Sequence, residues 1–266
     1  EKYKEYSEKL SRSFPLSHNS KGHCHKLIED YFLIPHEYPI LDKPTTFGFY
    51  RIGIIQSPDS LLDSINLQYN RTFLGSPDFK LRSLSDMKQS IYQDLITNKD
   101  KCITIQQGNF IEKFCSESLS VTTKYSFNEY CKNCEHSKKF KSCNSIEDHI
   151  HIYSNLSHKL QQVIIQDFKI TSSIENFNLY LQSNEYKLQS ILPILSDISQ
   201  FENNLTFLKT TNIIYILFYL ENEKIKLYTT PLLDHNLKNK PTYCFLYKEG
   251  SMFEAMFYYY NGKKSS

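Results

Sequence analysis

The last part of the chain constrains its fold most, because it contains four apolar segments separated by turn-forming residues. The first, residues 213–220 (IIYILFYL), is rich in β-branched and aromatic side chains and is followed by the polar tetrapeptide ENEK. Three further segments lie at 225–233, 242–250 and 251–262. Short apolar runs bounded by turn residues are typical of neighbouring β-strands. We therefore expect a mixed or antiparallel sheet at the C-terminus.

The first two thirds of the chain have mainly helical patterns. Apolar residues recur at three- and four-residue steps in 61–65, 85–97, 154–181 and 189–199. Pro193 lies inside the last segment and predicts a break there. Residues 48–55 alternate as a strand does, and residues 102–107 predict a short strand that ends at Gly108. The fold class that these patterns indicate is α+β, with helices in the first two thirds packed on the C-terminal sheet.

Length and composition suggest one large domain. The chain has 266 residues, of which 40% are hydrophobic, so it can bury a sizeable core. We expect a polar N-terminal extension over 1–12 and a single α+β domain over 13–262. The segment at about 128–150 is rich in cysteine and lysine and predicts an insertion on the surface of that domain. A chain that begins with Glu1 is expected to be an excised piece.

Net charge and cysteine content indicate which kinds of binding partner and which cellular compartment the sequence favours. The 31 Lys and Arg residues against 29 Asp and Glu residues give a net charge of +2, which disfavours a dedicated nucleic-acid binder. No apolar run approaches the ~20 residues that cross a bilayer, so no membrane partner is expected. Seven scattered cysteines do not form the regular framework of a small secreted domain, which favours an intracellular, reducing compartment.

The spacing Cys131-x2-Cys134 is the clearest local motif. Two cysteines at this spacing can hold one Zn²⁺ ion, and Cys143 with an imidazole would complete a tetrahedron. His149 is our predicted fourth ligand of a single structural zinc, with His136 and His151 as alternatives. Because no second C-x2-C or H-x3-5-H pair follows, free cysteines in a lysine-rich loop remain the alternative interpretation.

A serine nucleophile is the main catalytic hypothesis. Ser57 and Ser60 lie where a helix is expected to begin, and His235 is the nearest candidate base in the C-terminal part. Helix capping by Ser57 or Asp59 explains the same residues more simply. We therefore expect no catalytic residues.

The order of the segments resembles that of a known viral module. The segments that carry the resemblance are FPL at 14–16, FYRIGIIQSPDSLLDSI at 49–65, ITIQQGNFIEKF at 103–114, IENFNLYL at 174–181, TTNIIYILFYL at 210–220, IKLYTTP at 225–231 and KPTYCFLYKEGSMFEAMFYYYNG at 240–262. In this order they resemble the C-terminal module of the early transcription factor large subunit of nucleocytoplasmic large DNA viruses and its giant-virus relatives. The resemblance spans residues 14–262. The chain departs from the family pattern at 21–27 and at Phe253 and Ala255.

The resemblance implies a function and partners. It implies a non-catalytic domain that contacts the viral RNA polymerase machinery and an SNF2-like ATPase small subunit. Contacts with promoter DNA are left open. The resemblance also implies that the protein occurs in the host cytoplasm, at viral factories, and in the virion. A more distant similarity in element order is to ovarian-tumour-type, papain-like deubiquitinases, with Ser60 at the position of the nucleophilic Cys and Met252 and Phe253 at the position of the His. That similarity implies either an active hydrolase or a pseudo-enzyme. A zinc-stabilised interaction module is a further alternative.

Overall fold

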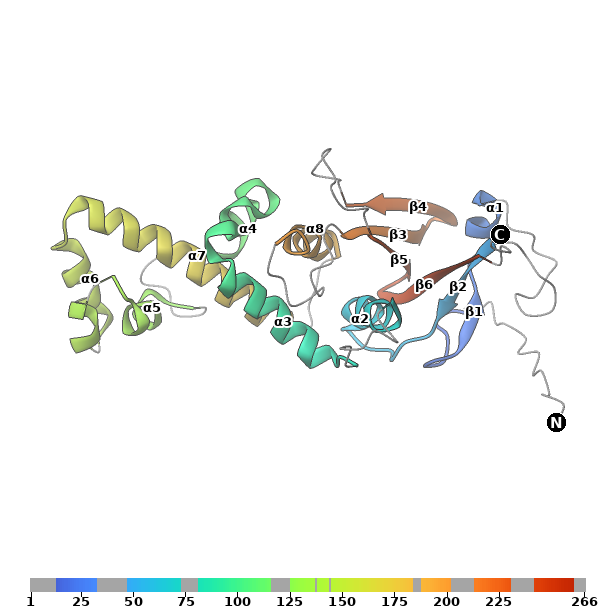
Figure 1. Cartoon of the computed structure of the whole chain (residues 1–266), viewed down its shortest axis with the longest axis horizontal. Helices are drawn as coiled ribbons and strands as arrows, with labels where there is room; N and C mark the ends of the chain where they lie inside the picture. Colours follow the sequence, from blue (N-terminus) through green and yellow to red (C-terminus); the bar gives the residue numbers. More distant parts are fainter. Residues whose placement is uncertain are drawn as a thin grey trace, which may run out of the picture. The chain divides into compact units, whose positions relative to one another are not determined.

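The structure is a computed structural model that describes residues 13–32, 47–72, 81–115, 125–136, 138–143, 145–183, 188–201, 213–230 and 242–260. Tertiary contacts divide the chain into two compact units, Glu1–Met87 with Thr210–Ser266, and Lys88–Lys209. The labels used for the helices and strands are those of Figure 1. The expected extension at 1–12 lies outside the described residues, and the single domain over 13–262 stays a prediction.

The first unit contains a six-stranded mixed sheet. Its strands are β1 (Lys21–His23), β2 (Phe47–Ile52), β3 (Ile213–Glu221), β4 (Lys224–Thr229), β5 (Thr242–Glu249) and β6 (Met252–Tyr260). The order across the sheet is β1-β2-β6-β5-β3-β4, and only the β3 and β5 pair is parallel among these strands. Four strands come from the C-terminal part, as expected, and two N-terminal strands extend one edge. With its helices, this sheet confirms the α+β class.

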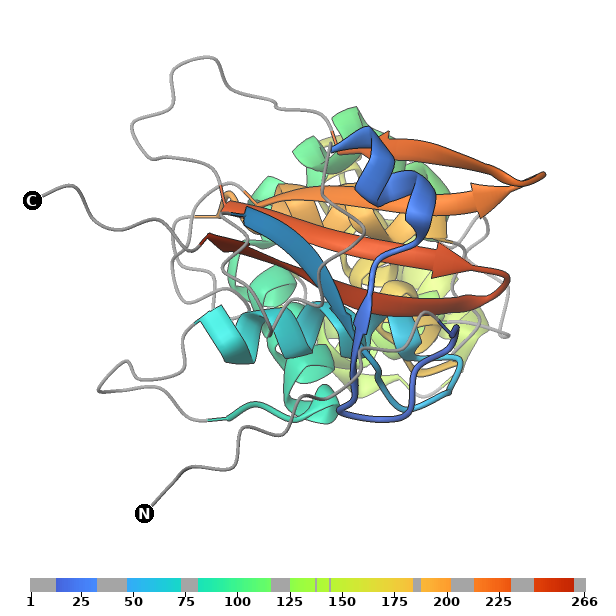
Figure 2. The ribbon, with the colours of Figure 1, turned by 90° about the vertical axis from the view of Figure 1, so that its right-hand side faces the viewer.

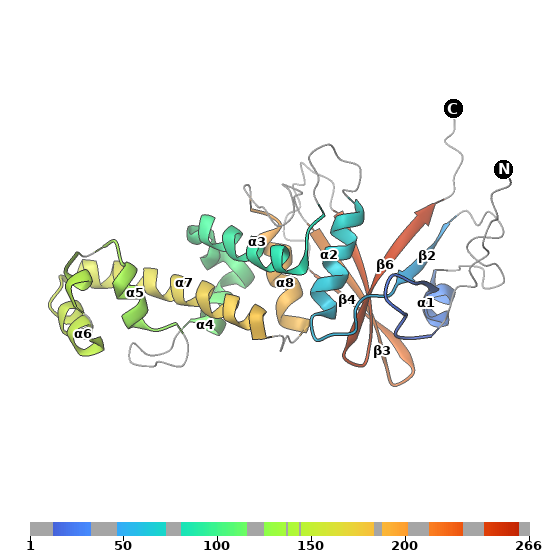
Figure 3. The same cartoon turned by 90° about the horizontal axis from the view of Figure 1, so that it is seen from below.

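One face of the sheet carries a continuous row of buried residues. Ile52 pairs with Ala255, Ala255 with Leu246, and Leu246 with Leu217, so the row crosses four strands, and all four side chains are 0% exposed. Helix α2 (Ser60–Thr72) packs against β6 and β5 and buries one apolar face of its own. Figure 3 shows α2 along the strands. Ile52 and Leu217 therefore lie in one core.

The opposite face carries a second cluster beneath helix α1 (Lys26–Tyr31). Its buried members are Cys24, Ile28, Phe49, Phe218, Tyr247 and Met256. Figure 2 shows α1 in front of the strands, with α2 behind them. The sheet is thus covered on both faces, which explains why β3 and β5 are apolar almost throughout instead of strictly alternating.

The second unit is helical. Its elements are α3 (Leu84–Thr97, most of it), the 3-10 segment η1 (Lys99–Gly108), α4 (Asn109–Phe114), α5 (Phe127–Asn133), η2 (Lys138–Ser142), α6 (Ile146–Ser154), α7 (His158–Ser183) and α8 (Leu188–Ile198). The long helix α7 contacts η1, α4 and α5. Phe177 of α7 packs edge-on against Phe110 and Phe114 of α4 at centroid distances of 5.5 and 5.0 Å. These ring contacts hold α4 against the middle of α7.

Two local expectations are wrong. Residues 102–107 are not a strand but lie in η1, where Gln106 and Gln107 have φ values of 54° and 56° and Gly108 has 95°. The Asp197 carboxylate accepts the backbone N–H of Gln106 at 2.8 Å and so holds this left-handed turn. Pro193 does not break α8, because the apolar residues on both sides of it are fully buried and packing outweighs the lost hydrogen bond.

The cysteine-rich segment at about 128–150 includes η2 and most of α5 and α6. A capping box begins α5: Glu129 N donates to the Ser126 hydroxyl at 3.2 Å, and Ser126 N donates to the Glu129 carboxylate at 2.7 Å. Phe127 and Phe140 are fully buried and pack with Phe168 of α7 in one apolar cluster. The signal that could have shown this helix is the spacing S-x-x-E at 126–129.

Candidate functional site

Two of the four predicted zinc ligands lie side by side in the apolar cluster on α7. Cys131 is 0% exposed and Cys134 is 3% exposed. Burial, with a smaller contribution from Cys134, raises the pKa of the Cys131 thiol to about 12. Cys143 is half-buried at the end of η2, with its Sγ 3.9 Å from Lys139 O. The structure therefore brings together Cys131 and Cys134 and leaves Cys143 apart.

His149 is fully buried with both ring nitrogens already in contact with other groups. Its Nδ1 lies 2.7 Å from the Asn128 side-chain oxygen, and its Nε2 lies 3.0 Å from Phe140 O. To bind a metal, the ring would have to give up one of these contacts. Within the described ranges, no group of three or more His, Cys, Asp and Glu side chains is placed to hold a metal ion. The zinc ion and its ligand set stay predictions.

The two candidate serine nucleophiles have structural partners. Ser57 Oγ accepts the backbone N–H of Asp59 at 3.2 Å in the turn before α2. Ser60 is 0% exposed, and its Oγ accepts the backbone N–H of Phe253 at 3.3 Å. The structure thus brings Ser60 to the start of β6. His235 lies outside the described residues.

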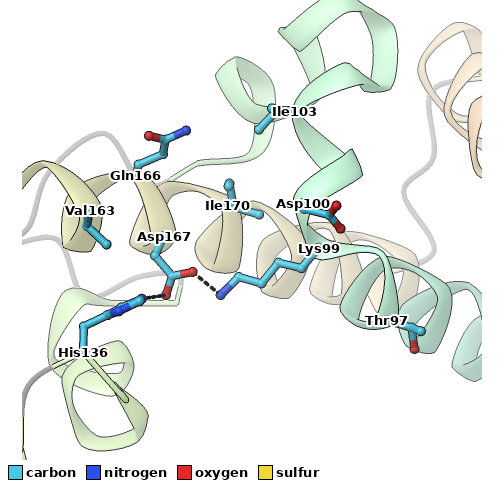
Figure 4. A pocket seen from close by; sticks show the side chains of 9 residues that line it. All are labelled: Thr97, Lys99, Asp100, Ile103, His136, Val163, Gln166, Asp167 and Ile170. Atoms are coloured by element: carbon cyan, nitrogen blue, oxygen red, sulfur yellow. Dashed lines mark ion pairs between the residues drawn. The ribbon is translucent and has the colours of Figure 1, made fainter.

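A pocket of about 520 Å³ in the second unit gathers charged and apolar side chains (Figure 4). It lies beside α7, between the end of α3, η1 and the segment after α5. Its lining residues are Thr97, Lys99, Asp100, Ile103, His136, Val163, Gln166, Asp167 and Ile170. Val163, Asp167 and Ile170 follow one another at helical spacing, so α7 presents them on one face.

Asp167 is the centre of the polar part of this pocket. Its Oδ1 lies 2.6 Å from Lys99 Nζ, and its Oδ2 lies 3.6 Å from His136 Nε2. Figure 4 shows Lys99 and His136 reaching Asp167 from opposite sides. Asp167 Oδ2 also accepts the Tyr130 hydroxyl at 2.8 Å. The carboxylate thus accepts from Lys99 and Tyr130, which come from two different segments of the chain, and the His136 ring lies close to it from a third.

Tyr130 anchors this carboxylate from the buried side. Burial raises the pKa of the Tyr130 hydroxyl well above its ordinary value, and hydrogen bonds with Cys134 and Asp167 raise it further. The hydroxyl therefore stays protonated and keeps donating to Asp167 across the physiological range. Tyr130 shares an apolar cluster with Cys131 and Cys134, so its hydroxyl connects Asp167 to that cluster.

Apolar side chains form the rest of the pocket wall. Ile103 is 46% exposed and Val163 is 42% exposed, whereas Ile170 is 9% exposed. Exposed apolar side chains can lose water against a partner, and the neighbouring charged groups can fix the partner's orientation. Lysine has three N–H groups, so Lys99 can pair with Asp167 and still donate to a bound partner.

Sequence reasoning did not find this pocket. Lys99 and Asp167 are distant in the sequence. Of the lining residues, Ile103 begins the segment at 103–114 and His136 is an alternative zinc ligand, but neither pattern connects them to α7. The one available signal is the helical spacing of Val163, Asp167 and Ile170, which shows a shared face but not the segment that faces it.

Comparison of the chain with models of known protein families and with curated proteins finds no match in either. The described helices include none that is long and apolar enough to cross a membrane.

Proposed function

We propose that the chain is a non-catalytic module of a large DNA virus early transcription factor, and that the pocket around Asp167 is its contact with a protein partner. The observation that carries the binding function is the fixed Asp167 carboxylate with Lys99 and His136 beside exposed Ile103 and Val163. The viral assignment rests on the ordered segments at 14–262 that resemble the early transcription factor large subunit.

The chemistry of the pocket defines the partner group that would fit. Ile103 and Val163 would cover an apolar side chain of the partner. Lys99 and His136 would donate to a carbonyl or carboxylate next to it. The partners that the proposal names are the viral RNA polymerase and the SNF2-like ATPase small subunit. Promoter DNA is a further contact within the proposal, although the net charge of +2 makes the protein partners the main ones.

Co-expression tests this proposal. The tagged chain is produced with the RNA polymerase subunits and the SNF2-like ATPase encoded by the same genome, and the purified complex is analysed by mass. We expect at least one of the two to copurify with the native chain and to be lost with Val163→Asp. Leu179→Asp is the matched control, because Leu179 is also an exposed apolar residue of α7 but does not line the pocket. Copurification that Val163→Asp leaves unchanged would contradict the assigned pocket, and the absence of both partners would contradict the viral assignment.

A degenerate or active hydrolase is the second candidate function. The observation that favours it is the contact between Ser60 Oγ and the start of β6. Because Ser60 is buried and its oxygen already accepts a backbone N–H, we favour the structural role. A fluorophosphonate probe distinguishes the two: we expect no labelling of Ser57 or Ser60. Labelling that is abolished by His235→Ala would make the hydrolase the better proposal.

A further inference from the structure

The pocket around Asp167 contains a second carboxylate, that of Asp100, which the proposed function leaves unused. Asp100 lies in the first turn of η1 and is exposed. Among the residues that the structure describes, none forms a hydrogen bond or an ion pair with this carboxylate. Asp167, in contrast, is already paired with Lys99 at 2.6 Å. The Asp100 carboxylate is therefore available to a bound partner.

The charges that line the pocket favour a cationic partner group. The lining contains two carboxylates, Asp100 and Asp167, and one ammonium group, Lys99. Lys99 and His136 both lie beside Asp167, so the charge of Lys99 is balanced within the pocket and that of Asp100 is not. Figure 4 shows the Lys99 side chain extended toward Asp167, away from the Asp100 carboxylate. Complementary charges across an interface fix its register and exclude like charges, so a positive group is favoured beside Asp100.

The wall beside Asp100 is apolar. In a 3-10 helix, residues i and i+3 lie one above the other, so Asp100 and Ile103 occupy one face of η1. Ile103 is 46% exposed, although it is a large apolar residue. Ile170 of α7 lines the same pocket and is buried. A cation that fits this wall must carry a long apolar stem behind its charge.

Arginine combines the two properties that this wall requires. Its aliphatic stem can cover Ile103 while the guanidinium holds the charge at the end of the side chain. The guanidinium is planar and matches a carboxylate with two parallel N–H donors, which a lysine ammonium does not do. Its remaining N–H groups can donate to the side-chain oxygens of Thr97 or Gln166, which also line the pocket.

We infer that the pocket binds an arginine side chain of the protein partner, with the guanidinium on the Asp100 carboxylate and the apolar stem on Ile103. This inference rests on the proposed function, because it specifies a partner group that enters the same pocket. The arginine stem and the partner's apolar side chain share the surface formed by Ile103 and Val163, and Lys99 donates to a carbonyl of the same segment.

Peptide selection on the purified full chain tests the inference. A random twelve-residue library is displayed on phage, and peptides that also bind Val163→Asp are removed, so that the retained peptides depend on the pocket. We expect the retained peptides to contain arginine. A selection that yields no peptide dependent on Val163 would contradict the proposed function, and the inference with it. Retained peptides without arginine would contradict the inference alone.

The best retained peptide then tests the pairing with Asp100. It is labelled with fluorescein and titrated by anisotropy, with each arginine in turn replaced by citrulline, which has nearly the same shape but no charge. One replacement should weaken binding to the native chain about tenfold, because charge-assisted hydrogen bonds are lost. Asp100→Asn should weaken binding of the original peptide, and in this variant the same citrulline replacement should have little further effect.

Asp148→Asn is the matched control. Asp148 is also an exposed carboxylate in the first turn of a helix of the same unit, but it does not line the pocket. This variant should bind the peptide as the native chain does, and the melting temperatures of both variants show whether each is folded. The citrulline replacement needs no change in the chain. The inference is wrong if Asp100→Asn leaves binding unchanged, or if its effect and that of citrulline add.

Discussion

The guanidinium of Arg51 and the carboxylate of Glu254 form an ion pair in which the two side chains are only 2% and 1% exposed. They lie on the neighbouring strands β2 and β6. Arg51 also donates to His23 O at 2.7 Å and to Ser13 O at 3.0 Å, and Glu254 accepts Leu16 N–H. The pair therefore ties the N-terminal segment to the centre of the sheet.

Removing one member of this pair should destabilise the protein strongly. Glu254→Leu leaves the buried guanidinium without its counter-charge, and we expect the free energy of unfolding to fall by about 3–5 kcal/mol. The double variant Arg51→Met with Glu254→Leu should lose less unfolding free energy than the sum of the two single variants, because it leaves no buried charge without a partner. Urea unfolding followed by circular dichroism measures all three. Strict additivity of the single variants would contradict the coupling.

The turn between β3 and β4 should gain stability from one glycine. Asn222 and Glu223 have φ values of 50° and 59°, a left-handed geometry that favours Asn followed by Gly. We expect Glu223→Gly to raise the free energy of unfolding by about 0.5 kcal/mol, since the relieved strain exceeds the added chain entropy. Lys224→Gly, one residue further and inside the strand, should instead lower it. A loss of stability in the first variant would contradict the assigned turn.

The Asp197 carboxyl should give the free energy of unfolding a specific pH dependence. Burial raises the pKa of its carboxyl, and the hydrogen bonds from Gln106 act in the opposite direction. Because this pKa is higher in the folded state than in the unfolded state, the carboxyl stabilises the fold at pH values below its ordinary pKa of 3.8. This contribution is lost as the pH rises through the folded-state pKa. The unfolding free energy of the native chain minus that of Asp197→Asn should therefore decrease from pH 3.5 upward. A difference between the two unfolding free energies that increases with pH would contradict this expectation.

The zinc prediction can be tested through the cysteines. Elemental analysis of protein purified without chelator should give one zinc per chain. Cys143, which is half-buried, should react with iodoacetamide at pH 8 faster after zinc is removed. Cys131 should stay slow in both states, because it is fully buried and burial raises its thiol pKa. A preparation without zinc, or labelling of Cys143 that ignores chelation, would show that no such site exists.

β2 and the four C-terminal strands were predictable from the sequence because they are short and separated by turn residues, whereas β1, with the sequence KGH, was not predicted. The pairing of Glu221 with Lys224 and of Glu249 with Met252 follows directly from those turns. Leu227 is another exception: its alternation with lysines is typical of a strand with one buried face, yet the side chain is 51% exposed. Periodicity shows which face a side chain occupies, but not whether its strand lies at the edge of the sheet.

The second unit was less predictable, for a physical reason. Its short helices begin at capping residues such as Ser126 and Ser145, and they become stable by packing Phe127 and Phe140 on α7. Their sequence is polar and lysine-rich outside those few aromatic residues. The pocket depends on where η1 meets α7, which is a tertiary contact that no local pattern encodes.

The central claim is that the pocket around Asp167 binds a protein partner. Its most direct test is the affinity of the purified chain for the viral RNA polymerase or the SNF2-like ATPase, measured by biolayer interferometry. We predict that Val163→Asp weakens binding at least tenfold and that Leu179→Asp does not change it, since a contact centre depends on a few anchors. Equal affinity of the native chain and Val163→Asp would contradict the claim.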